Sequence, residues 1–343
     1  MEFCSLSFDD LKEWLKNSGE ASFRAEQIFD WIYRKGARSF QEMTNLKAEL
    51  RENLAKEFVF PCLKLIATQE SGETRKFLWE LADGKRVESV LIYSFDRRTV
   101  CLSSQVGCPA RCAFCASGKE GLLRCLSTGE IVEQALQIDR FLKEKGERVS
   151  HLVYMGMGEP LENYGPVVRS IKILNSDKGL HISQRRITIS TVGIIEGIDR
   201  LGDEQDLCVN LVLSLHAPNQ HLRKKIIPFA RKYALEDLMS AIMRYAEKTK
   251  RDPTFEYTLI SQINDGEEHA RELASLLRDK QCTVNLIPYN PVAGLRLARP
   301  ERKIVIRFRE ILESAGITTT WRYTKGDDIA AACGQLALIK GES

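Results

Sequence analysis

Three cysteines within eight residues form the group best suited to chemistry. Cys108, Cys112 and Cys115 have the spacing C-x3-C-x2-C. A structural zinc site takes four ligands, commonly as two separated pairs, and this chain has no second C-x2-C pair. A four-iron, four-sulfur cluster is held by cysteine thiolates, and three of them leave one iron open to another ligand. The spacing therefore predicts an iron–sulfur cluster with one open iron.

Five other cysteines are scattered, and each is predicted to be a small buried side chain: Cys4, Cys62, Cys125, Cys208 and Cys282. The start of the chain, residues 1–19, mixes charged with apolar residues and does not resemble a signal peptide. No apolar stretch approaches the roughly 18–20 residues that cross a bilayer. We therefore expect a cytoplasmic protein with reduced thiols and no membrane partner.

The composition excludes fibrous, collagen-like and wholly disordered proteins. The chain has 343 residues, of which 43% are hydrophobic, and 50 Lys+Arg against 47 Asp+Glu give a net charge of +3. The charge is uneven, because residues 221–251 carry nine basic and three acidic side chains and residues 296–309 carry six and one. These two stretches are candidate phosphate contacts, although solvated helix faces have the same composition.

Strand-like and helical patterns alternate over most of the chain. Six strand-like runs are expected at residues 99–103, 151–155, 186–191, 208–215, 254–260 and 283–288. Crossover helices are expected between them at residues 129–145, 165–175, 235–249 and 267–280. Such alternation predicts an α/β fold with a parallel sheet and outer helices. A partial barrel of six β/α units fits best, with an open doubly wound sheet as the alternative.

Two smaller regions precede this alternation. Residues 1–60 show short helical stripes, the first of which begins with the capping box Ser7–Asp10. Residues 76–93 read as an antiparallel meander that leads into the main sheet. We therefore divide the chain into an N-terminal helical accessory domain, a meander extension, the barrel and a C-terminal segment: residues 1–70, 71–100, 101–295 and 296–343.

A resemblance to a known family covers nearly the whole chain, from about residue 20 to about residue 340. It rests on the ordered motifs CLSSQVGCPARCAFCASGKEGLLRCLSTGEIVEQ, VYMGMGEPLENY, ITISTVG, VNLVLSLHAPN, FEYTLI, VNLIPYNPV and GDDIAAACGQLALI. Together they resemble the RlmN/Cfr family of radical S-adenosylmethionine RNA adenine methyltransferases, and the RlmN branch most. The resemblance implies a partial (β/α)6 radical-SAM barrel with the cluster at its C-terminal mouth.

The family's cofactor residues carry over onto matching positions. The resemblance implies that Cys108, Cys112 and Cys115 hold the [4Fe-4S] cluster, whose open iron takes S-adenosylmethionine. Gly158 and Glu159 match the contact to the cofactor's amino group. The remaining cofactor-binding positions that the resemblance implies are Ser190, Ser214, Leu215, His216 and Asn290.

Three further residues match the family's catalytic groups. Cys333 would be methylated by one S-adenosylmethionine, and a second would yield a radical that takes hydrogen from the new S-methyl group. The resulting carbon joins Cys333 to the adenine, and Glu88 would accept the ring proton. Cys101 would then attack the Cys333 sulfur, which releases methylated RNA and leaves a disulfide for external reduction. The resemblance thus implies two S-adenosylmethionine molecules per turnover and an electron donor such as flavodoxin.

The expected function is methylation of carbon 2 of a specific adenosine in 23S rRNA and also in tRNA, by a monomer. Methylation of carbon 8, as in the Cfr branch, is the nearest alternative. A radical enzyme acting on a small molecule or peptide, and a non-catalytic iron–sulfur or RNA-binding module, are the others. Two positions depart from the family pattern: Cys125 stands where a polar residue is usual, and Ala330 where an acidic residue is expected.

Overall fold

The computed structural model describes residues 1–321, 326 and 329–336. Ten strands form one mixed sheet in the order β1-β2-β3-β4-β7-β8-β9-β10-β11-β12, and β5 and β6 form a separate antiparallel pair. The strands are β1 (Lys64–Ser71), β2 (Thr74–Glu80), β3 (Arg86–Ser94), β4 (Arg97–Cys101), β5 (Gln105–Gly107), β6 (Leu122–Cys125), β7 (His151–Tyr154), β8 (Ile187–Thr191), β9 (Asn210–Ser214), β10 (Thr254–Leu259), β11 (Thr283–Pro288) and β12 (Thr318–Trp321).

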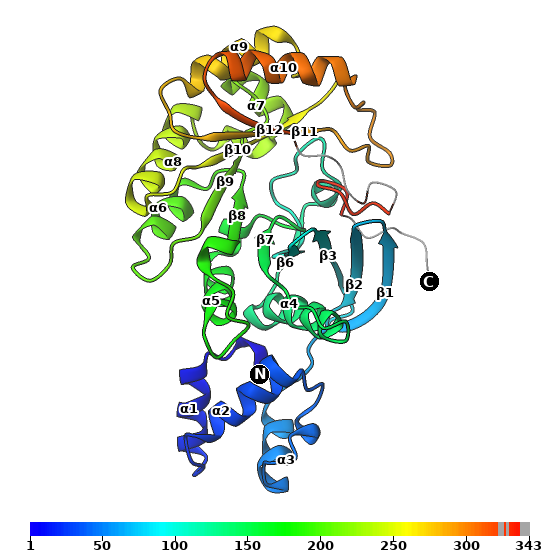
Figure 1. Cartoon of the computed structure of the whole chain (residues 1–343), viewed down its shortest axis with the longest axis vertical. Coiled ribbons are helices and arrows are strands. Elements are labelled where there is room, and N and C mark those ends of the chain that lie inside the picture. Colours follow the sequence, from blue (N-terminus) through cyan, green and yellow to red (C-terminus); the bar gives the residue numbers. More distant parts are fainter. Residues whose placement is uncertain (322–325, 327–328, 337–343) are drawn as a thin grey trace.

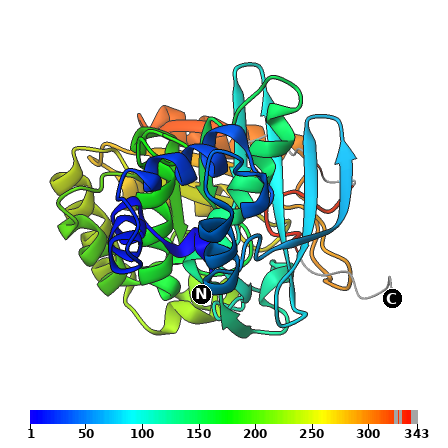
Figure 2. The same cartoon turned by 90° about the horizontal axis from the view of Figure 1, so that it is seen from below.

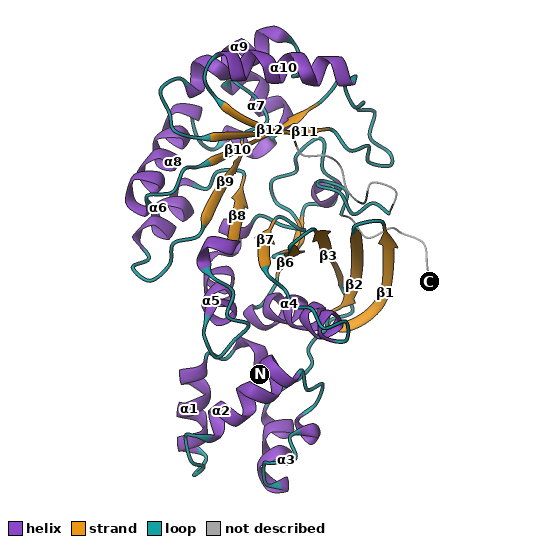
Figure 3. Cartoon of the chain, viewed as in Figure 1, coloured by secondary structure: helices purple, strands orange, loops and turns teal. Residues whose placement is uncertain are grey.

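In the ten-stranded sheet, β4 and the strands β7 to β12 run parallel to one another (Figures 1 and 3). Helices cover the outside of this part of the sheet. The connecting helices are α4 (Thr128–Lys143), α5 (Tyr164–Asn175), α6 (Ile195–Asp203), α7 (Gln220–Ile226), α8 (Leu235–Thr249), α9 (Glu267–Leu277) and α10 (Arg302–Ser314). Parallel strands need such crossovers, which place helices against the sheet and bury most residues of β8 to β11.

The predicted α/β architecture is confirmed, since all six expected parallel strands and all four expected crossover helices are present. The structure adds β12 as a seventh parallel strand beside β11, together with α6 and α7. The described strands do not close into a barrel, because β1 and β12 each have a neighbour on one side only. No helix among the described residues is long and apolar enough to cross a membrane.

The antiparallel meander places different side chains on its two faces. Lys76 pairs with Val90, which pairs with Cys101, and Leu78 pairs with Glu88. Because side chains alternate along a strand and cross-strand partners share a face, Lys76, Glu88 and Cys101 lie on one face. The opposite face carries Phe77, whose ring contacts Phe141 of α4 at 5.8 Å between centroids.

The N-terminal helices α1 (Phe8–Asn17), α2 (Arg24–Phe29) and α3 (Ala48–Glu57), with a π-helical turn (Asp30–Lys35), lie across one end of the molecule (Figures 1 and 2). The predicted capping box is present, since Asp10 N donates to Ser7 Oγ and Ser7 N to Asp10 Oδ2. This region docks on the start of α4, where the amide of Gly129 donates to Ser5 Oγ at 2.8 Å.

Candidate active site

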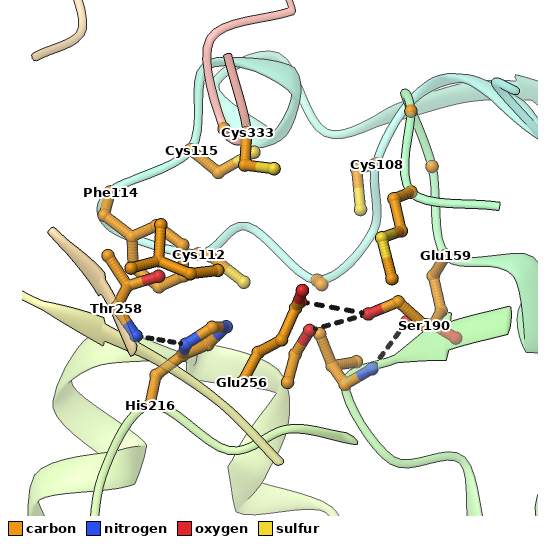
Figure 4. Close-up of a pocket in the computed structure, with 18 of the residues that line it drawn as sticks. Cys108, Cys112, Phe114, Cys115, Glu159, Ser190, His216, Glu256, Thr258 and Cys333 are labelled. Atoms are coloured by element: carbon orange, nitrogen blue, oxygen red, sulfur yellow. Dashed lines mark hydrogen bonds between the residues drawn. The ribbon is translucent and has the colours of Figure 1, made fainter. Parts of the chain in front are cut away.

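One cavity brings together residues from the loop that contains Cys108, Cys112 and Cys115, the ends of the parallel strands and the C-terminal segment (Figure 4). We call this loop the cluster loop, after the iron–sulfur cluster that its spacing predicts. The cavity lies at the edge at which the carboxyl ends of parallel strands meet, and it is where α/β folds commonly bind ligands. Ten of the predicted site residues line the cavity: Cys108, Cys112, Cys115, Gly158, Glu159, Ser190, Ser214, His216, Asn290 and Cys333. Leu215, Cys101 and Glu88 are not among its lining residues.

The three-cysteine loop is fixed by contacts with distant segments. The amide of Ala113 donates to Ile226 O at 2.8 Å, and the ring of Phe114 meets His216 edge-on at 4.8 Å between centroids. Burial raises the pKa of the Cys108 thiol to about 12, and it also raises the pKa of Cys112 and Cys115. These thiols are therefore protonated near neutral pH until a metal centre displaces the protons.

Gly158 and Glu159 follow β7, and contacts with neighbouring segments fix the position of each. Gly158 has a φ of 110°, and a Cβ there would stand 2.6 Å from Ser104 Oγ, so glycine is required. The buried Glu159 carboxylate accepts from Thr191 Oγ1 at 2.7 Å and from the Val192 amide at 2.8 Å. Burial raises the pKa of Glu159 to about 7. Glu159 thus ties the end of β7 to the end of β8.

A hydroxyl pair and a carboxylate lie along the floor of the cavity. Ser190 Oγ on β8 is 3.2 Å from Ser214 Oγ on β9 and 3.5 Å from Glu256 Oε2 on β10. The sequence reading omits Glu256 as a site residue, although the motif FEYTLI contains it. Nothing in the local sequence marks Glu256 as a site residue, because a carboxylate within a strand is ordinarily expected to face solvent.

His216 presents a nitrogen-bound proton to the cavity. Its Nδ1 accepts the Thr258 amide at 2.9 Å, so the proton of the neutral ring resides on Nε2 (Figure 4). Burial lowers the pKa of His216 to about 3, which keeps the ring neutral. The residue has a φ of 56°, and its own amide and that of Leu215 both donate to Glu256 O at 3.1 Å.

Arg223 was not predicted as a site residue, but its side chain supports the ends of β8 and β9. It is 1% exposed, and its guanidinium donates to Val192 O at 2.6 Å, Leu215 O at 3.2 Å and Ser214 O at 3.3 Å. The positive charge of Arg223 also lowers the pKa of Cys112 against the larger effect of burial. Its place in a basic run had suggested a phosphate contact, but the side chain is internal.

The C-terminal segment lies against the cluster loop and brings Cys333 to the cavity. Ala116 N donates to Gly334 O at 2.8 Å, and Ser117 Oγ to Leu336 O at 2.5 Å. Asn290 Nδ2 donates to Cys333 O at 3.1 Å. Cys333 is exposed and lies beside Cys115 in the close-up (Figure 4). The contacts of Ala116 and Ser117 join segments that are more than two hundred residues apart.

Glu88 and Cys101 lie together on the meander face opposite α4. Glu88 is buried, and its Oε1 is 3.0 Å from Lys76 Nζ, with both side chains only 5% exposed. Cys101 is 9% exposed. Thr74 Oγ1, on the same face as Lys76, would be only 2.6 Å from a Cβ on Gly326, so Gly326 lies against this face at Thr74.

All ten cysteines are free thiols, so the expected disulfide between Cys101 and Cys333 is not formed in this structure. Cys125 is exposed on β6 and does not line the cavity. Ala330 adopts a φ of 48°, an uncommon conformation for a residue with a Cβ, and the next amide, of Ala331, donates to Gly326 O.

The chain is similar to known proteins over its full length. Residues 1–60 match the ribosomal RNA large subunit methyltransferase N-terminal domain, and residues 102–274 match the radical SAM superfamily. A protein from Protochlamydia amoebophila named probable dual-specificity RNA methyltransferase RlmN 2 is 61% identical, over 100% of this chain and 96% of its own. The chain belongs to the RlmN family of radical SAM methyltransferases.

Other RlmN-family relatives agree. The probable dual-specificity RNA methyltransferase RlmN of Dictyoglomus thermophilum is 48% identical, with 98% of each chain covered. The crystal structure of a radical SAM methyltransferase from Sphaerobacter thermophilus is 43% identical and superposes with a TM-score of 0.96, over 98% of this chain and 99% of that one. These matches confirm the family and the fold expected from the motifs.

Membership of the RlmN family implies a [4Fe-4S] cluster and S-adenosylmethionine as cofactors. The donor set fits, because three thiols line one cavity that also contains hydroxyl, carboxylate and imidazole groups. No three His, Cys, Asp or Glu side chains among the described residues surround a single metal ion.

Proposed function

We propose that this protein methylates carbon 2 of a specific adenosine in 23S rRNA, and in tRNA, through methylated Cys333. The observation that carries the proposal is that Cys333 lines the same cavity as Cys108, Cys112 and Cys115. A cysteine that accepts a methyl group must reach the cofactor, and it must also reach the adenine. Cys333 is exposed at the mouth of the cavity and meets both requirements.

We assign the cluster to Cys108, Cys112 and Cys115, which leave one iron for S-adenosylmethionine. Bound there, the cluster supplies the electron for reductive cleavage of that cofactor. The remaining residues that we assign to cofactor binding are Gly158, Glu159, Ser190, Ser214, Leu215, His216 and Asn290. The neutral His216 offers an Nε2 proton to an acceptor on the cofactor, and Glu256 adds a carboxylate that can accept from a hydroxyl or an amine.

The chain's own residues then carry the methyl group through a covalent adduct. The Cys333 sulfur accepts a methyl group by displacement, for which it must be a thiolate. One hydrogen of this methyl group would pass to the radical that bound S-adenosylmethionine would supply, and the carbon would join the adenine ring while it stays bonded to sulfur. The adduct would give one electron to the cluster, and Glu88 would accept the ring proton. Cys101 then attacks the Cys333 sulfur, which forms a disulfide and breaks the sulfur–carbon bond, and the released carbon takes up a proton. An external dithiol reduces that disulfide, and two S-adenosylmethionine molecules are used per turnover.

The partners follow from this chemistry. The enzyme takes electrons from a flavodoxin-like donor, works in the cytoplasm and acts as a monomer. Residues 1–70 act as an accessory RNA-binding domain, residues 71–100 as the extension that carries Glu88, residues 101–295 as the barrel, and residues 296–343 as the segment that carries Cys333. An adenine must be unstacked to enter the cavity, as base-modifying enzymes generally require.

Mass analysis of nucleosides tests the proposal. A 23S rRNA fragment and a tRNA are incubated anaerobically with the cluster-loaded protein, reductant and S-adenosylmethionine, and then digested. We expect 2-methyladenosine from both RNAs. Finding 8-methyladenosine would contradict the carbon 2 assignment and support the Cfr-type reaction. Finding no methylated adenosine with the cluster intact would contradict the substrate assignment.

A further inference from the structure

A second cavity, of ≈ 450 Å³, lies on the other side of the meander from Glu88 and Cys101. It is bounded by β1, β2, the C-terminal half of α4, the loop before α3 that contains Arg38 and the loop after α3 that contains Pro61. Figure 1 shows α4 beside the lower ends of β1 and β2, above the N-terminal helices. We call it the α4 cleft; its charged lining residues are Arg38, Arg75, Arg140 and Glu144.

The α4 cleft contains buried cationic groups that lack acceptors. Arg140 is 7% exposed, and neither its Nε nor its Nη2 has a hydrogen-bond partner among the described residues. Arg75 Nε is also buried without a partner in the described part of the chain. Burial lowers the pKa of Arg140, with the nearby Glu133 opposing that effect. A guanidinium in this state is stabilised by an anion that accepts from its N–H groups.

The nearby carboxylates do not meet this need. Glu133 accepts from the Cys62 amide at 2.5 Å and from the Leu63 amide at 3.3 Å. Glu144 Oε1 is 2.7 Å from Arg38 Nη2 at the exposed rim, where the two side chains are 61% and 69% exposed. Within the described part of the chain, Arg75 pairs with Glu70 through Nη2 and lies over the Phe141 ring, which leaves its Nε without an acceptor. The cleft thus carries three arginines against one glutamate on its lining. Arg140, the most buried of them, lies over the Phe60 ring but has no ion pair with a described carboxylate.

We propose that the α4 cleft binds a backbone phosphate of the RNA substrate. A guanidinium binds phosphate through two parallel N–H donors, and arginine is favoured wherever that geometry matters. Arg38 at the rim would meet the phosphate first, and Arg75 and Arg140 would receive it. The inference rests on the proposed RNA substrate. Because the cleft opens on the opposite face of the meander from Cys101, the contact belongs to RNA outside the target adenosine.

The test measures RNA binding without S-adenosylmethionine, so it does not depend on methyl transfer. Affinity for a 23S rRNA fragment is measured by fluorescence anisotropy at several KCl concentrations for Arg38→Gln, Arg140→Lys and Glu144→Gln. Arg278→Gln, an exposed arginine at the end of α9, is the matched control. We expect Arg38→Gln to lower the slope of log affinity against log salt by about 0.7 to 0.9, the value of one phosphate contact.

The other variants sharpen the outcome. Glu144→Gln should tighten binding, because it removes the competing carboxylate, and Arg278→Gln should bind as the parent does. If Arg140→Lys does not fold, Arg38→Gln and Glu144→Gln decide the question. Unchanged slopes and affinities for both overturn the proposal. AMP or inorganic phosphate that raises the melting temperature of the parent but not of Arg38→Gln, with unchanged RNA slopes, would also overturn it in favour of a free nucleotide or phosphate.

Discussion

Cysteine side chains in this protein differ mainly in exposure, and exposure sets what each thiol can do. Cys108, Cys112 and Cys115 are enclosed by the loop and by the ends of the strands, whereas Cys333 is exposed at the mouth of the same cavity. A buried thiol resists ionisation and is inert until metallated, while an exposed thiol can become the reactive thiolate. One cavity therefore brings three enclosed thiols together with one exposed thiol.

Alkylation of the cluster-free protein tests this difference. At pH 8, iodoacetamide should label the exposed Cys125 and Cys333 well before Cys108, because only the thiolate reacts. Burial raises the pKa of Cys108 to about 12, so its thiolate fraction, and with it the labelling rate, should rise about tenfold from pH 8 to pH 9. Peptide mass spectrometry measures each site. Equal labelling rates for Cys108 and Cys125 would contradict the conclusion that burial suppresses ionisation of the Cys108 thiol.

Removing either catalytic cysteine should stop the reaction at a different step. Cys333→Ala should abolish methyl transfer, because no sulfur remains to carry the carbon. Cys101→Ala should trap a covalent protein–RNA adduct, because nothing attacks the Cys333 sulfur. Denaturing gel electrophoresis with labelled RNA detects the adduct. Free methylated RNA at the normal rate from Cys101→Ala would rule out the resolving role, and Cys125→Ala is the matched control.

The buried pair of Lys76 and Glu88 gives a stability prediction. Lys76→Met removes the cation that is paired with the buried Glu88 carboxylate and should cost about 3–5 kcal/mol of unfolding free energy. Lys76→Met combined with Glu88→Gln should recover most of that loss, because the buried group that lost its Lys76 partner is then neutral. Urea denaturation of both variants and of Glu88→Gln completes the cycle. Additive losses in the double variant would show that the pair is not coupled.

At the scale of elements, the ends of β8 and β9 form a platform that Arg223 holds together. Its guanidinium spans the carbonyls of Val192, Ser214 and Leu215, and the next residue, His216, faces the cavity. The side chain acts through the strand ends and is therefore a positioning residue. A helix that begins after β9 thus sets the geometry of two neighbouring strands.

Arg223→Met should lower the unfolding free energy by at least about 1–3 kcal/mol, the cost of leaving a buried acceptor unsatisfied. It should also weaken binding of S-adenosylmethionine, because Ser214 and His216 lose their support. Calorimetry measures both quantities. Arg231→Met, an exposed arginine nearby, should change stability by no more than about 0.5 kcal/mol. Matching effects of the two substitutions would contradict the role of Arg223.

At the scale of the whole molecule, the N-terminal helices are joined to the barrel through a close contact at the start of α4. A Cβ on Gly129 would stand 2.5 Å from Glu2 Oε2 and 2.9 Å from Ser5 Oγ. Ser127 Oγ and Glu2 Oε2 also form a hydrogen bond across this junction. The Glu2 and Ser5 side chains thus fill the space that a Cβ would need, which explains why glycine occupies a helical position here.

Gly129→Ala should therefore cost about 1–3 kcal/mol through overpacking at the junction. Gly165→Ala is the matched control, because Gly165 is also the second residue of a helix and has no atom within 4 Å of its hypothetical Cβ. That control should be neutral or stabilising by up to about 1 kcal/mol, since alanine favours helix. Thermal unfolding compares the two. Equal stabilities would show that the junction can relax without loss.

The sequence by itself determined the features that depend on neighbouring residues. The cysteine spacing predicted a three-thiol loop, alternation of patterns predicted the crossover helices, and Ser7 with Asp10 predicted the first helix start. Each of these signals is local, because a cap or an apolar stripe acts within a few residues. The family followed from motifs that are likewise short.

Only the tertiary structure decided the features that depend on distant contacts. The exposed edge strand β1 and the late strand β12 lack a strong apolar run, so pairing with their neighbours, and not propensity, defines them. Packing also buried Arg223 and Arg140, which composition would place in solvent, and set Glu256 on the cavity floor. The hydrogen bond of Ser117 with Leu336 spans 219 positions. A local sequence pattern does not indicate which distant segment supplies the hydrogen-bond partner of a buried polar group.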